Sequence, residues 1–438
     1  MKIVIIGAGP TGLGAGYRLS ELGHDFKIFE KNLHIGGISA SFVDENRFTW
    51  DIGGHVVFSH YDYFDNILNK ALKKKYLEHV REAWIWIMDR FVPYPFQNNI
   101  KFLPKEALLE CLMELIDAQK TKDDSKNFKE WILNIFGEGI AKYFMFPYNY
   151  KVWAHKPEVM NKNWIAERVS VVDVERILKN IIYDRIDAGW GPNSTFRFPE
   201  KGGTGAIFRH MGSYFQDKIF LEKEVVRINS KGKKVFFADK SSEDYDILIN
   251  TMPLDLFMER SDINTPDAKK LKHSSSIIVG IGIKGKVPEK FRTKCWNYFP
   301  EHDCPFYRVT VFSNYSPNNA PSGHWSLMTE TSYSKHKKVD KSRIVDETIK
   351  GLINTKFISP SDRISTKWTY DLEYSYPVPT LERDSALEKI QPKLERRQIY
   401  SRGRFGAWKY EVGNMDHSVM QGVELVDRLL KGKKETTY

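Results

Sequence analysis

The first residues of this 438-residue chain, Met1-Lys-Ile-Val-Ile-Ile-Gly7-Ala-Gly9-Pro-Thr-Gly12, decide its fold. Residues 1–6 are an apolar run that predicts a buried strand, and the glycine-rich turn leads into an amphipathic segment that predicts a helix through Leu22. A second strand is expected from Asp25 to Phe29. A strand, turn, helix and strand of this size bind the phosphates of a dinucleotide at the helix N-terminus.

Three glycines and one acidic residue point to the kind of dinucleotide. Gly7 permits the tight turn, Gly9 lets a pyrophosphate approach the backbone, and Gly12 allows helix and strand to pack closely. Glu30 lies 18 residues after Gly12, where its carboxylate can accept hydrogen bonds from ribose hydroxyls and would repel a 2′-phosphate. This favours FAD or NAD over NADP. Gly36-Gly37 offers another close backbone approach, and we therefore expect FAD.

A second three-glycine pattern, Gly280-Ile-Gly282-Ile-Lys-Gly285, lacks the required context. Lys-Val-Pro288 follows it, so no helix N-terminus is available to hold a phosphate. We expect a strand that ends in a turn. No other valid fingerprint exists for a dedicated nicotinamide domain, which suits a flavin that does not depend on stably docked NAD(P).

Length and composition indicate a multidomain, water-soluble enzyme. Hydrophobic residues make up 41% and charged residues 28% of the chain, and no apolar run approaches the ~18 to 20 residues of a membrane span. Three cysteines give no disulfide framework, so we expect a cytoplasmic protein without a membrane partner. The net charge of +10 would attract an anionic partner, but the lysine clusters suit solvated surface, and we expect no nucleic-acid partner.

The order of expected elements predicts an α/β fold with a discontinuous, Rossmann-like FAD-binding domain. That domain is interrupted by a helical insert, the substrate or flap domain, and by an antiparallel sheet domain that binds substrate. The expected boundaries are 1–78, 190–265 and 400–438 for the FAD-binding domain, 102–189 for the helical domain, and 79–101 with 266–399 for the sheet domain.

Three short stretches combine aromatic, amide and basic residues as a nucleotide site requires: Tyr94 to Asn99, Pro147 to Trp153, and Arg402 to Tyr410. A base needs a ring to stack on and an amide to read its edge, and a diphosphate needs guanidinium and phenol donors. Each stretch alone is equally compatible with a strand packed on its neighbours. Their joint presence beside an FAD fingerprint favours a nucleotide site.

The stretch Gly413-Asn-Met-Asp-His-Ser418 opens the last expected helix. The helix N-terminus can face the flavin pyrimidine, and it can equally be an ordinary capping motif with Asp416 or Ser418 as the cap. His55 and His60 do not suit one metal ion, because five-residue spacing on an extended segment separates them and no cysteine or carboxylate cluster joins them. We expect no metal site.

Longer strings resemble one family, the UDP-galactopyranose mutases of the eukaryotic type, over nearly the whole chain. The strings are Gly53 to His60, Pro93 to Asn99, Tyr148 to Trp153, Gly189 to Asn193, Cys295 to Tyr298, Cys304 to Arg308, Tyr376 to Arg383 and Gly403 to His417. The resemblance implies an FAD-dependent isomerase of galactofuranose biosynthesis, which interconverts UDP-galactopyranose and UDP-galactofuranose. Reduced flavin N5 would attack the anomeric carbon and expel UDP.

The same resemblance implies roles for individual residues. The catalytic residues would be His55, Arg168, Arg308 and Arg404. The cofactor-binding residues would be Gly7, Gly9, Gly12, Glu30, Gly36, Gly37, Gly54, His55, Val225, Gly413, Asn414, Asp416, His417 and Ser418. The substrate-binding residues would be Tyr94, Phe96, Gln97, Met145, Asn149, Trp153, Arg168, Asn193, Trp296, Tyr298, Arg308, Tyr376, Arg404, Tyr410 and Asn414. Arg81 would dock NADPH, the transient reductant, although Ala83 stands where similar fungal enzymes carry serine.

Other readings remain open from the sequence alone. The chain could be a mutase for a related sugar nucleotide, such as UDP-N-acetylgalactosamine or a GDP-sugar, because the residues do not measure the room at the sugar C2. A flavin oxidase of the amine oxidase type would share the FAD fingerprint. A non-catalytic nucleotide-binding protein is disfavoured by the complete residue set. Pro317 to His324 is a short connection where fungal relatives carry a longer insertion, so no oligomeric state is inferred, although an oligomer fits the sequence.

Overall fold

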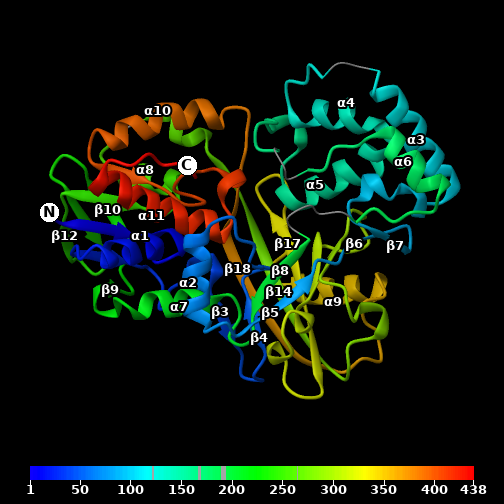
Figure 1. The fold of residues 1–438 in the computed structure, drawn as a ribbon, viewed down its shortest axis with the longest axis horizontal. Coiled ribbons are helices and arrows are strands. Elements are labelled where there is room, and N and C mark those ends of the chain that lie inside the picture. The colour runs from blue at the N-terminus through cyan, green and yellow to red at the C-terminus, as the bar shows by residue number, and fades with distance from the viewer. Residues whose placement is uncertain (121–122, 166–168, 189–193, 264) are drawn as a thin grey trace.

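A computed structural model gives the structure of the chain and describes residues 1–438 apart from 121–122, 166–168, 189–193 and 264 (Figure 1). The lobe at the left of Figure 1 holds both termini and is built on a parallel sheet of order β19-β13-β1-β2-β9. Its strands are β1 (Ile3–Ile6), β2 (Phe26–Phe29), β9 (Ile219–Phe220), β13 (Ile247–Asn250) and β19 (Ile399–Ser401). Three distant parts of the sequence form one sheet, which confirms the predicted discontinuous α/β fold.

Glycines fix the geometry of the turn between β1 and helix α1 (Pro10–Glu21). Gly7 has a φ of +97°, and a Cβ at Gly12 would lie 1.9 Å from the Gly7 carbonyl oxygen. Helix α1 packs on the last helix, α11 (Met415–Lys431), so closely that a Cβ at Gly422 would lie 2.2 Å from the Thr11 carbonyl oxygen. The glycines therefore allow strand, turn and both helices to lie in direct backbone contact.

The rest of this lobe covers the parallel sheet. Its helices are α2 (Asp62–Leu72), α7 (Gly205–Ser213), α8 (Leu254–Arg260) and α10 (Arg383–Glu395). An antiparallel sheet of order β10-β11-β12 consists of β10 (Val225–Asn229), β11 (Lys234–Phe237) and β12 (Ser242–Asp244). There are also two two-stranded antiparallel ribbons. They are β3 (Ser41–Val43) with β4 (Thr49–Asp51), and β5 (Tyr76–Val80) with β8 (Thr195–Pro199).

A seven-stranded sheet of order β18-β14-β17-β16-β15-β6-β7 forms the second part. Its strands are β6 (Ala83–Ile87), β7 (Arg90–Pro93), β14 (Lys272–Lys284), β15 (Trp296–Tyr298), β16 (Arg308–Val311), β17 (His324–Tyr333) and β18 (Ile364–Val378), with α9 (Ile344–Asn354) beside them. The predicted antiparallel sheet is confirmed, although β6 and β15 pair in parallel.

The second three-glycine pattern lies in β14, as predicted, and its glycines serve packing. A Cβ at Gly280 would lie 2.6 Å from the Trp50 ring, and a Cβ at Gly282 would lie 2.5 Å from the Phe48 ring. Phe48 and Trp50 are themselves stacked and almost completely buried. The two glycines therefore make room for large rings on the sheet face.

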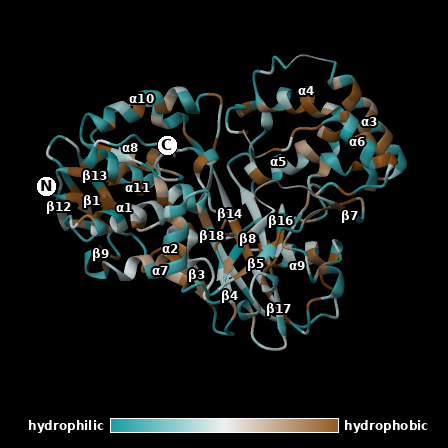
Figure 2. Cartoon of the chain, in the orientation of Figure 1, coloured by the Kyte–Doolittle hydropathy of each residue, from teal (hydrophilic) through white to brown (hydrophobic). Residues whose placement is uncertain are grey.

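Helices form the third part, at the upper right of Figure 1. They are α3 (Lys105–Ala118), α4 (Phe128–Ile140), α5 (Phe146–Trp153) and α6 (Val174–Ile182), and a π-helical turn, Ala141–Met145, joins α4 to α5. Hydrophobic residues concentrate on the strands and on the packed sides of helices (Figure 2). Among the described residues, no helix combines the length and apolar character needed to cross a membrane. The residue boundaries of the three parts stay a prediction.

Candidate active site

A cavity of about 1270 Å³ lies where the three parts of the fold meet. Its wall includes the β1 turn, the first turn of α11, helix α5 and the strands β15, β16 and β18. Pockets for one drug-sized molecule measure roughly 300–1,000 Å³. The cavity therefore has room for a dinucleotide together with a second ligand.

Backbone atoms form one half of the cavity, which we call the dinucleotide half. Gly7 and Gly9 line it, and Gly9 is the N-cap residue of the 12-residue helix α1, without a side-chain cap. Gly37 lies opposite, and a Cβ there would come within 3.1 Å of the Gly9 Cα. A helix N-terminus that opens between two closely spaced backbones suits a pyrophosphate. Gly12 and Gly36 do not line the cavity. They allow close backbone packing next to it, Gly12 against Gly7 and Gly36 against Ala40.

Glu30 stands at the end of β2 and lines the same half. It is buried, and its carboxylate accepts hydrogen bonds from the Ala8 amide at 2.8 Å and from the Asn32 amide at 2.9 Å. These bonds fix the carboxylate beside the glycine turn, where a ribose would follow the phosphates. Val225 lines the cavity nearby.

The first turn of α11 lines the cavity with Gly413, Asn414, Asp416, His417 and Ser418. Asn414 is the N-cap residue, so neither Asp416 nor Ser418 caps this helix. The buried Asp416 carboxylate instead lies 2.8 Å from His60 Nδ1 and 3.2 Å from His417 Nδ1. The sequence argument that no cysteine or carboxylate cluster joins His55 and His60 did not foresee the contact of His60 with Asp416, because these residues are 356 positions apart in the chain.

The residues of the dinucleotide half fit FAD. The glycine cradle excludes side chains where a pyrophosphate would lie, Glu30 stands beside the ribose position, and the N-terminus of α11 opens toward the far end of the cavity. The donor set is that of a flavin dinucleotide site, and FAD fits it.

Side chains form the other half of the cavity, which we call the arginine half. Arg308 on β16 pairs with Glu330 on β17: Nε and Nη2 donate to the two carboxylate oxygens at 2.7 Å each. Glu330 also accepts from the Gly54 amide at 2.9 Å and from the Tyr307 hydroxyl at 2.7 Å. Burial opposes ionisation of Glu330, but Arg308, the Gly54 amide and the Tyr307 hydroxyl together outweigh it and hold the pKa of this carboxyl below its ordinary value.

Glu330 is the residue that the sequence reasoning missed. It stands directly opposite Arg308 in the β16–β17 register, and its carboxylate connects that arginine to the loop of Gly54 and His55. The signal was a single acidic residue in the otherwise uncharged strand β17. Its meaning depends on strand pairing, which the sequence pattern alone does not supply.

Aromatic rings line the arginine half. Tyr298 lies 5.4 Å from the ring of Tyr94 and 5.4 Å from that of Tyr148, between centroids, and Tyr376 lies 5.7 Å from Tyr410. Burial raises the pKa of Tyr94, Tyr148 and Tyr376 above the ordinary value. These three phenols therefore stay protonated at neutral pH, and each can donate a hydrogen bond to an anionic ligand.

Helix α5 and the segment after β7 add amide and indole groups. Met145, Asn149 and Trp153 line the cavity, and the Asn149 side chain donates to the Met145 carbonyl at 2.8 Å. Gln97 also lines it, and its Nε2 donates to the Ser170 carbonyl at 2.6 Å. Within the described part of the chain, the buried Gln97 Oε1 atom has no hydrogen-bond partner. That oxygen suits the N–H edge of a base.

Phe96 does not belong to the cavity wall. It is completely buried and stacks on Phe144, which does line the cavity, at 4.7 Å between centroids. The structure therefore brings Phe96 close to the predicted uridine position only through Phe144. Arg168 and Asn193, which were predicted to contact substrate, lie outside the described residues.

His55 lies between the two halves, on the loop held by Glu330. Burial, followed by the positive charge of Arg404, lowers the pKa of His55 to about 4. Its imidazole is therefore neutral at physiological pH. A neutral ring can donate one hydrogen bond and accept another.

Two further arginines complete the site. The Arg404 guanidinium lies 5.3 Å from the Tyr376 ring and 5.8 Å from the Tyr410 ring. Arg81 lies 5.0 Å from the Trp296 ring and 5.4 Å from the Phe58 ring. All of these side chains line the cavity, and the arginine half thus combines Arg308, Arg404 and Arg81 with many aromatic rings, which suits a nucleotide with an anionic tail.

Comparisons with known proteins agree with this geometry. Residues 10–430 match the family described as flavin containing amine oxidoreductase. A crystal structure of reduced UDP-galactopyranose mutase superposes on the chain with a TM-score of 0.97 at 48% sequence identity, covering 100% of this chain and 95% of that one.

More distant relatives share the fold or one segment. A putative protoporphyrinogen oxidase from Exiguobacterium sp. gives a TM-score of 0.74 at 14% identity, with 99% of each chain covered, a likeness that concerns the fold alone. A 4,4′-diapophytoene desaturase of Staphylococcus aureus is 39% identical over 122 residues. That match spans 28% of this chain and only 23% of the desaturase.

Proposed function

The chain belongs to the flavin-containing amine oxidoreductase family and, within it, to the UDP-galactopyranose mutases; on this premise we propose that it interconverts UDP-galactopyranose and UDP-galactofuranose. The observation that carries the proposal is the likeness at 48% identity to a UDP-galactopyranose mutase over the whole chain. The cavity supports it, because an FAD-shaped half adjoins a half rich in arginines and phenols.

We propose that FAD occupies the dinucleotide half, held by Gly7, Gly9, Gly37 and Glu30, with the first turn of α11 at its flavin end. When bound and reduced, FAD supplies a nucleophile, its N5 atom, for the anomeric carbon of the sugar. The protein must then position the sugar carbon and stabilise the departing UDP. Both tasks belong to the arginine half.

We propose that Arg308 and Arg404 bind the diphosphate together with Tyr298, Tyr376 and Tyr410. The two bonds to Glu330 fix the Arg308 fork before substrate arrives, which saves ordering cost on binding. Protonated Tyr376 adds an O–H donor without adding charge. Negative charge that develops on UDP as the bond to the sugar breaks is stabilised by these fixed donors.

We propose that the uridine lies against helix α5. Asn149 and Trp153 face the cavity from this helix and Met145 from the π-helical turn before it, and Gln97 and Tyr94 face it from the segment after β7. The partnerless Gln97 Oε1 atom is an acceptor for the uracil N3–H group. His55, neutral and hydrogen-bond competent, stands where the sugar would meet the flavin.

We propose NADPH as the activating reductant, with Arg81 as a docking residue. Its guanidinium lies over the Trp296 and Phe58 rings at the cavity wall, where it can meet a second anionic nucleotide. We further propose a cytoplasmic location, supported by three buried cysteines without a disulfide among the described residues.

The test is chromatographic. Enzyme reduced with dithionite under nitrogen receives UDP-galactofuranose, and the expected product is UDP-galactopyranose, whereas oxidised enzyme gives none. UDP-N-acetylgalactofuranose and a GDP-hexofuranose, assayed in parallel, measure the sugar and base preference. Oxygen consumption with amines, and no sugar isomer with reduced enzyme, would contradict the proposal and favour an oxidase.

A further inference from the structure

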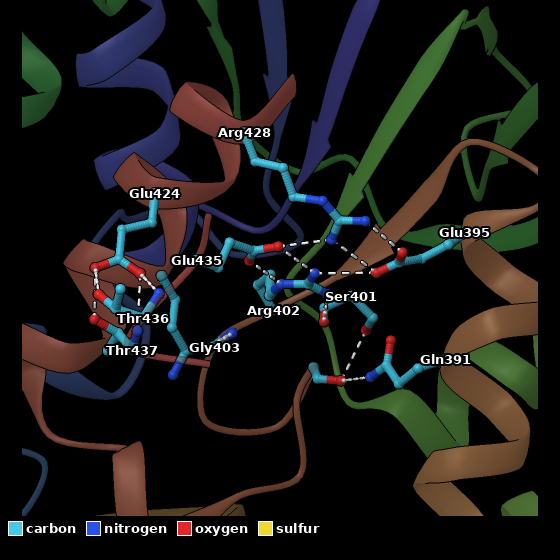
Figure 3. Close-up of polar contacts among 12 residues, drawn as sticks. Gln391, Glu395, Ser401, Arg402, Gly403, Glu424, Arg428, Glu435, Thr436 and Thr437 are labelled. Atoms are coloured by element: carbon cyan, nitrogen blue, oxygen red, sulfur yellow. Dashed lines mark hydrogen bonds and ion pairs between the residues drawn. The ribbon is translucent and has the colours of Figure 1, made fainter. Parts of the chain in front are cut away.

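The segment that follows α11, residues 432–438, folds back onto the lobe that carries the parallel sheet (Figure 3). Its Glu435 carboxylate accepts two hydrogen bonds from Arg402, at 2.6 and 2.8 Å, and one from Arg428, at 2.7 Å. Both arginines also bond to Glu395 on α10, Arg402 at 3.1 Å and Arg428 at 2.7 Å. The Tyr438 ring lies 3.7 Å from the Arg402 guanidinium.

Burial separates this network from the ion pairs on the surface. The side chains of Arg402 and Glu435 are 0% and 6% exposed, whereas those of the Lys142–Glu110 pair are 60% and 37% exposed. Burial opposes ionisation of Glu435, but Arg402 and Arg428 hold its pKa below the ordinary value. Among the described residues, Glu435 accepts two of the three carboxylate hydrogen bonds from Arg402 and Glu395 accepts the third, so removing the Glu435 charge leaves this buried arginine only partly compensated.

Arg402 leads directly into the cavity wall. It follows strand β19, and the next two residues, Gly403 and Arg404, line the cavity. The Gly403 amide donates to Gln421 at 2.7 Å, and its φ of +88° brings the backbone against Thr11. Arg402 is thus held by the Glu435 network and Gly403 by Gln421 of α11, immediately before Arg404 in the chain.

The same segment also contacts the middle of helix α11, at Glu424. Glu424 accepts four hydrogen bonds from the amides and hydroxyls of Thr436 and Thr437. The Thr437 hydroxyl bonds to the Tyr61 hydroxyl at 3.0 Å. Tyr61 follows His60, whose ring bonds to Asp416 in the first turn of α11. The segment therefore joins two stretches that line the cavity without lining it itself.

We propose that residues 435–438 form a positioning latch, in which Glu435 acts through Arg402 to hold Arg404 against the diphosphate of the nucleotide sugar. The role of Arg404 in this statement rests on the proposed function. Glu435 contacts neither substrate nor cofactor in the arrangement described and is a positioning residue.

The test compares Glu435→Gln with wild type, each loaded with FAD and chemically reduced. The dissociation constant of UDP is measured by titration calorimetry, and KM and kcat are measured for UDP-galactofuranose. Misplacing Arg404 is expected to raise the UDP dissociation constant and KM about tenfold and to lower kcat as well, because Arg404 also stabilises charge on the departing UDP, with FAD content unchanged. Glu435→Asp, which keeps the charge, is expected to restore most of the affinity.

Glu110→Gln is the matched control, because it removes one charge from an exposed ion pair whose residues do not line the cavity, and it is expected to leave the affinity for UDP unchanged. If Glu435→Gln does not fold, Tyr438→Leu is tested in its place. Tyr438→Leu removes the ring over Arg402 without changing any charge, and it is expected to weaken UDP binding about threefold. Reduced thermal stability with wild-type UDP affinity and KM would overturn the latch.

The proposed function fails separately from the latch. A wild-type protein that binds UDP but does not isomerise the sugar contradicts the proposed function, while the UDP titrations of the variants still judge the latch. A wild-type protein that does not bind UDP contradicts both. An active wild type with unchanged UDP affinity in Glu435→Gln contradicts the latch alone.

Discussion

The two halves of the cavity are built from different materials. In the dinucleotide half, the ligand-facing surface is mainly backbone, and glycines keep it bare: Gly9 and Gly37 face each other without side chains. In the arginine half, long side chains from separate strands converge, and a buried carboxylate, Glu330, fixes them. A backbone site is encoded within one short stretch, whereas a side-chain site depends on how distant strands pair.

This difference predicts distinct losses. Substitutions in the dinucleotide half should abolish FAD binding. Substitutions in the arginine half should weaken binding of the nucleotide sugar and leave FAD bound. Substitutions in each half test whether FAD binding and nucleotide-sugar binding are lost independently.

The most damaging change should be Gly9→Ala, because protein without FAD has no activity. In the protein without ligand the new Cβ would meet, among the described residues, only the Gly37 Cα, at 3.8 Å, an ordinary contact, so the fold should persist. The methyl group would occupy the space of the pyrophosphate, and we expect FAD content to fall by more than about tenfold. Flavin absorbance of the purified protein measures it, with circular dichroism as the check on folding.

Gly23→Ala is the matched control for this change. Gly23 has a φ of +69°, and no atom of the described residues lies within 4 Å of the Cβ that alanine would add, so the substitution costs backbone strain of about 1 kcal/mol without touching the cavity. It should retain FAD. A Gly9→Ala protein that keeps its flavin would break the backbone account of this half.

Glu330→Gln should produce the next largest effect. Arg308 loses its charged partner and the Gly54 amide loses its ionised acceptor, so we expect kcat/KM to fall about a hundredfold while FAD stays bound. Leaving the partly buried Arg308 without a carboxylate should also lower the stability of the fold. Steady-state kinetics and thermal unfolding measure the two effects. Loss of FAD from the Glu330→Gln protein would contradict the independence of the two halves.

Arg81→Lys should affect only activation. The lysine keeps the charge but loses the planar stacking on Trp296 and Phe58, so flavin reduction by NADPH should slow about tenfold. Stopped-flow absorbance under nitrogen measures that rate. Activity after dithionite reduction should match wild type, and an equal loss in both assays would place Arg81 in the arginine half itself.

The smallest effect concerns His55, at the boundary of the halves. Its pKa of about 4 lies below the ordinary 6.5, so the unfolded chain binds the proton more readily. The stability contributed by neutral His55 is therefore complete above pH 6.5 and is lost as the pH falls toward 4. Between pH 6.5 and 8 no change is expected.

Nuclear magnetic resonance titration of the histidine ring protons measures this pKa, and His55→Gln assigns the signal by removing it. The stability of wild type relative to His55→Gln should decrease between pH 6.5 and 4. A His55 signal that titrates near pH 6.5 would show that burial and Arg404 do not govern this group.

The contrast between the halves also explains what the sequence could predict. Gly7, Gly9, Gly12 and Glu30 lie within 24 residues and carry their own context, so the β1 turn and the α/β fold were predictable. The strand at Gly280 was predictable too, but the reason for its glycines was not, because Phe48 and Trp50 reach them only in the folded sheet.

Glu330 and Asp416 show the limit. Glu330 can hold Arg308 only because the two residues lie opposite each other in a strand pair. Asp416 can bond to His60 only because the fold brings together residues 356 positions apart. Neither residue has a local pattern that reveals its partner. The resemblance to a known family supplied roles for single residues, but only the fold shows which carboxylates hold those residues in place.

The most direct measurement of the central claim is positional isotope exchange. UDP-galactopyranose labelled with ¹⁸O at the bridge between sugar and diphosphate is incubated with reduced enzyme and recovered. If the two halves act together to break and reform the bond between the anomeric carbon and that oxygen, the label should scramble into non-bridging positions, as ³¹P resonance shifts report. Reduced, FAD-loaded enzyme that leaves the label entirely in the bridge would contradict the account.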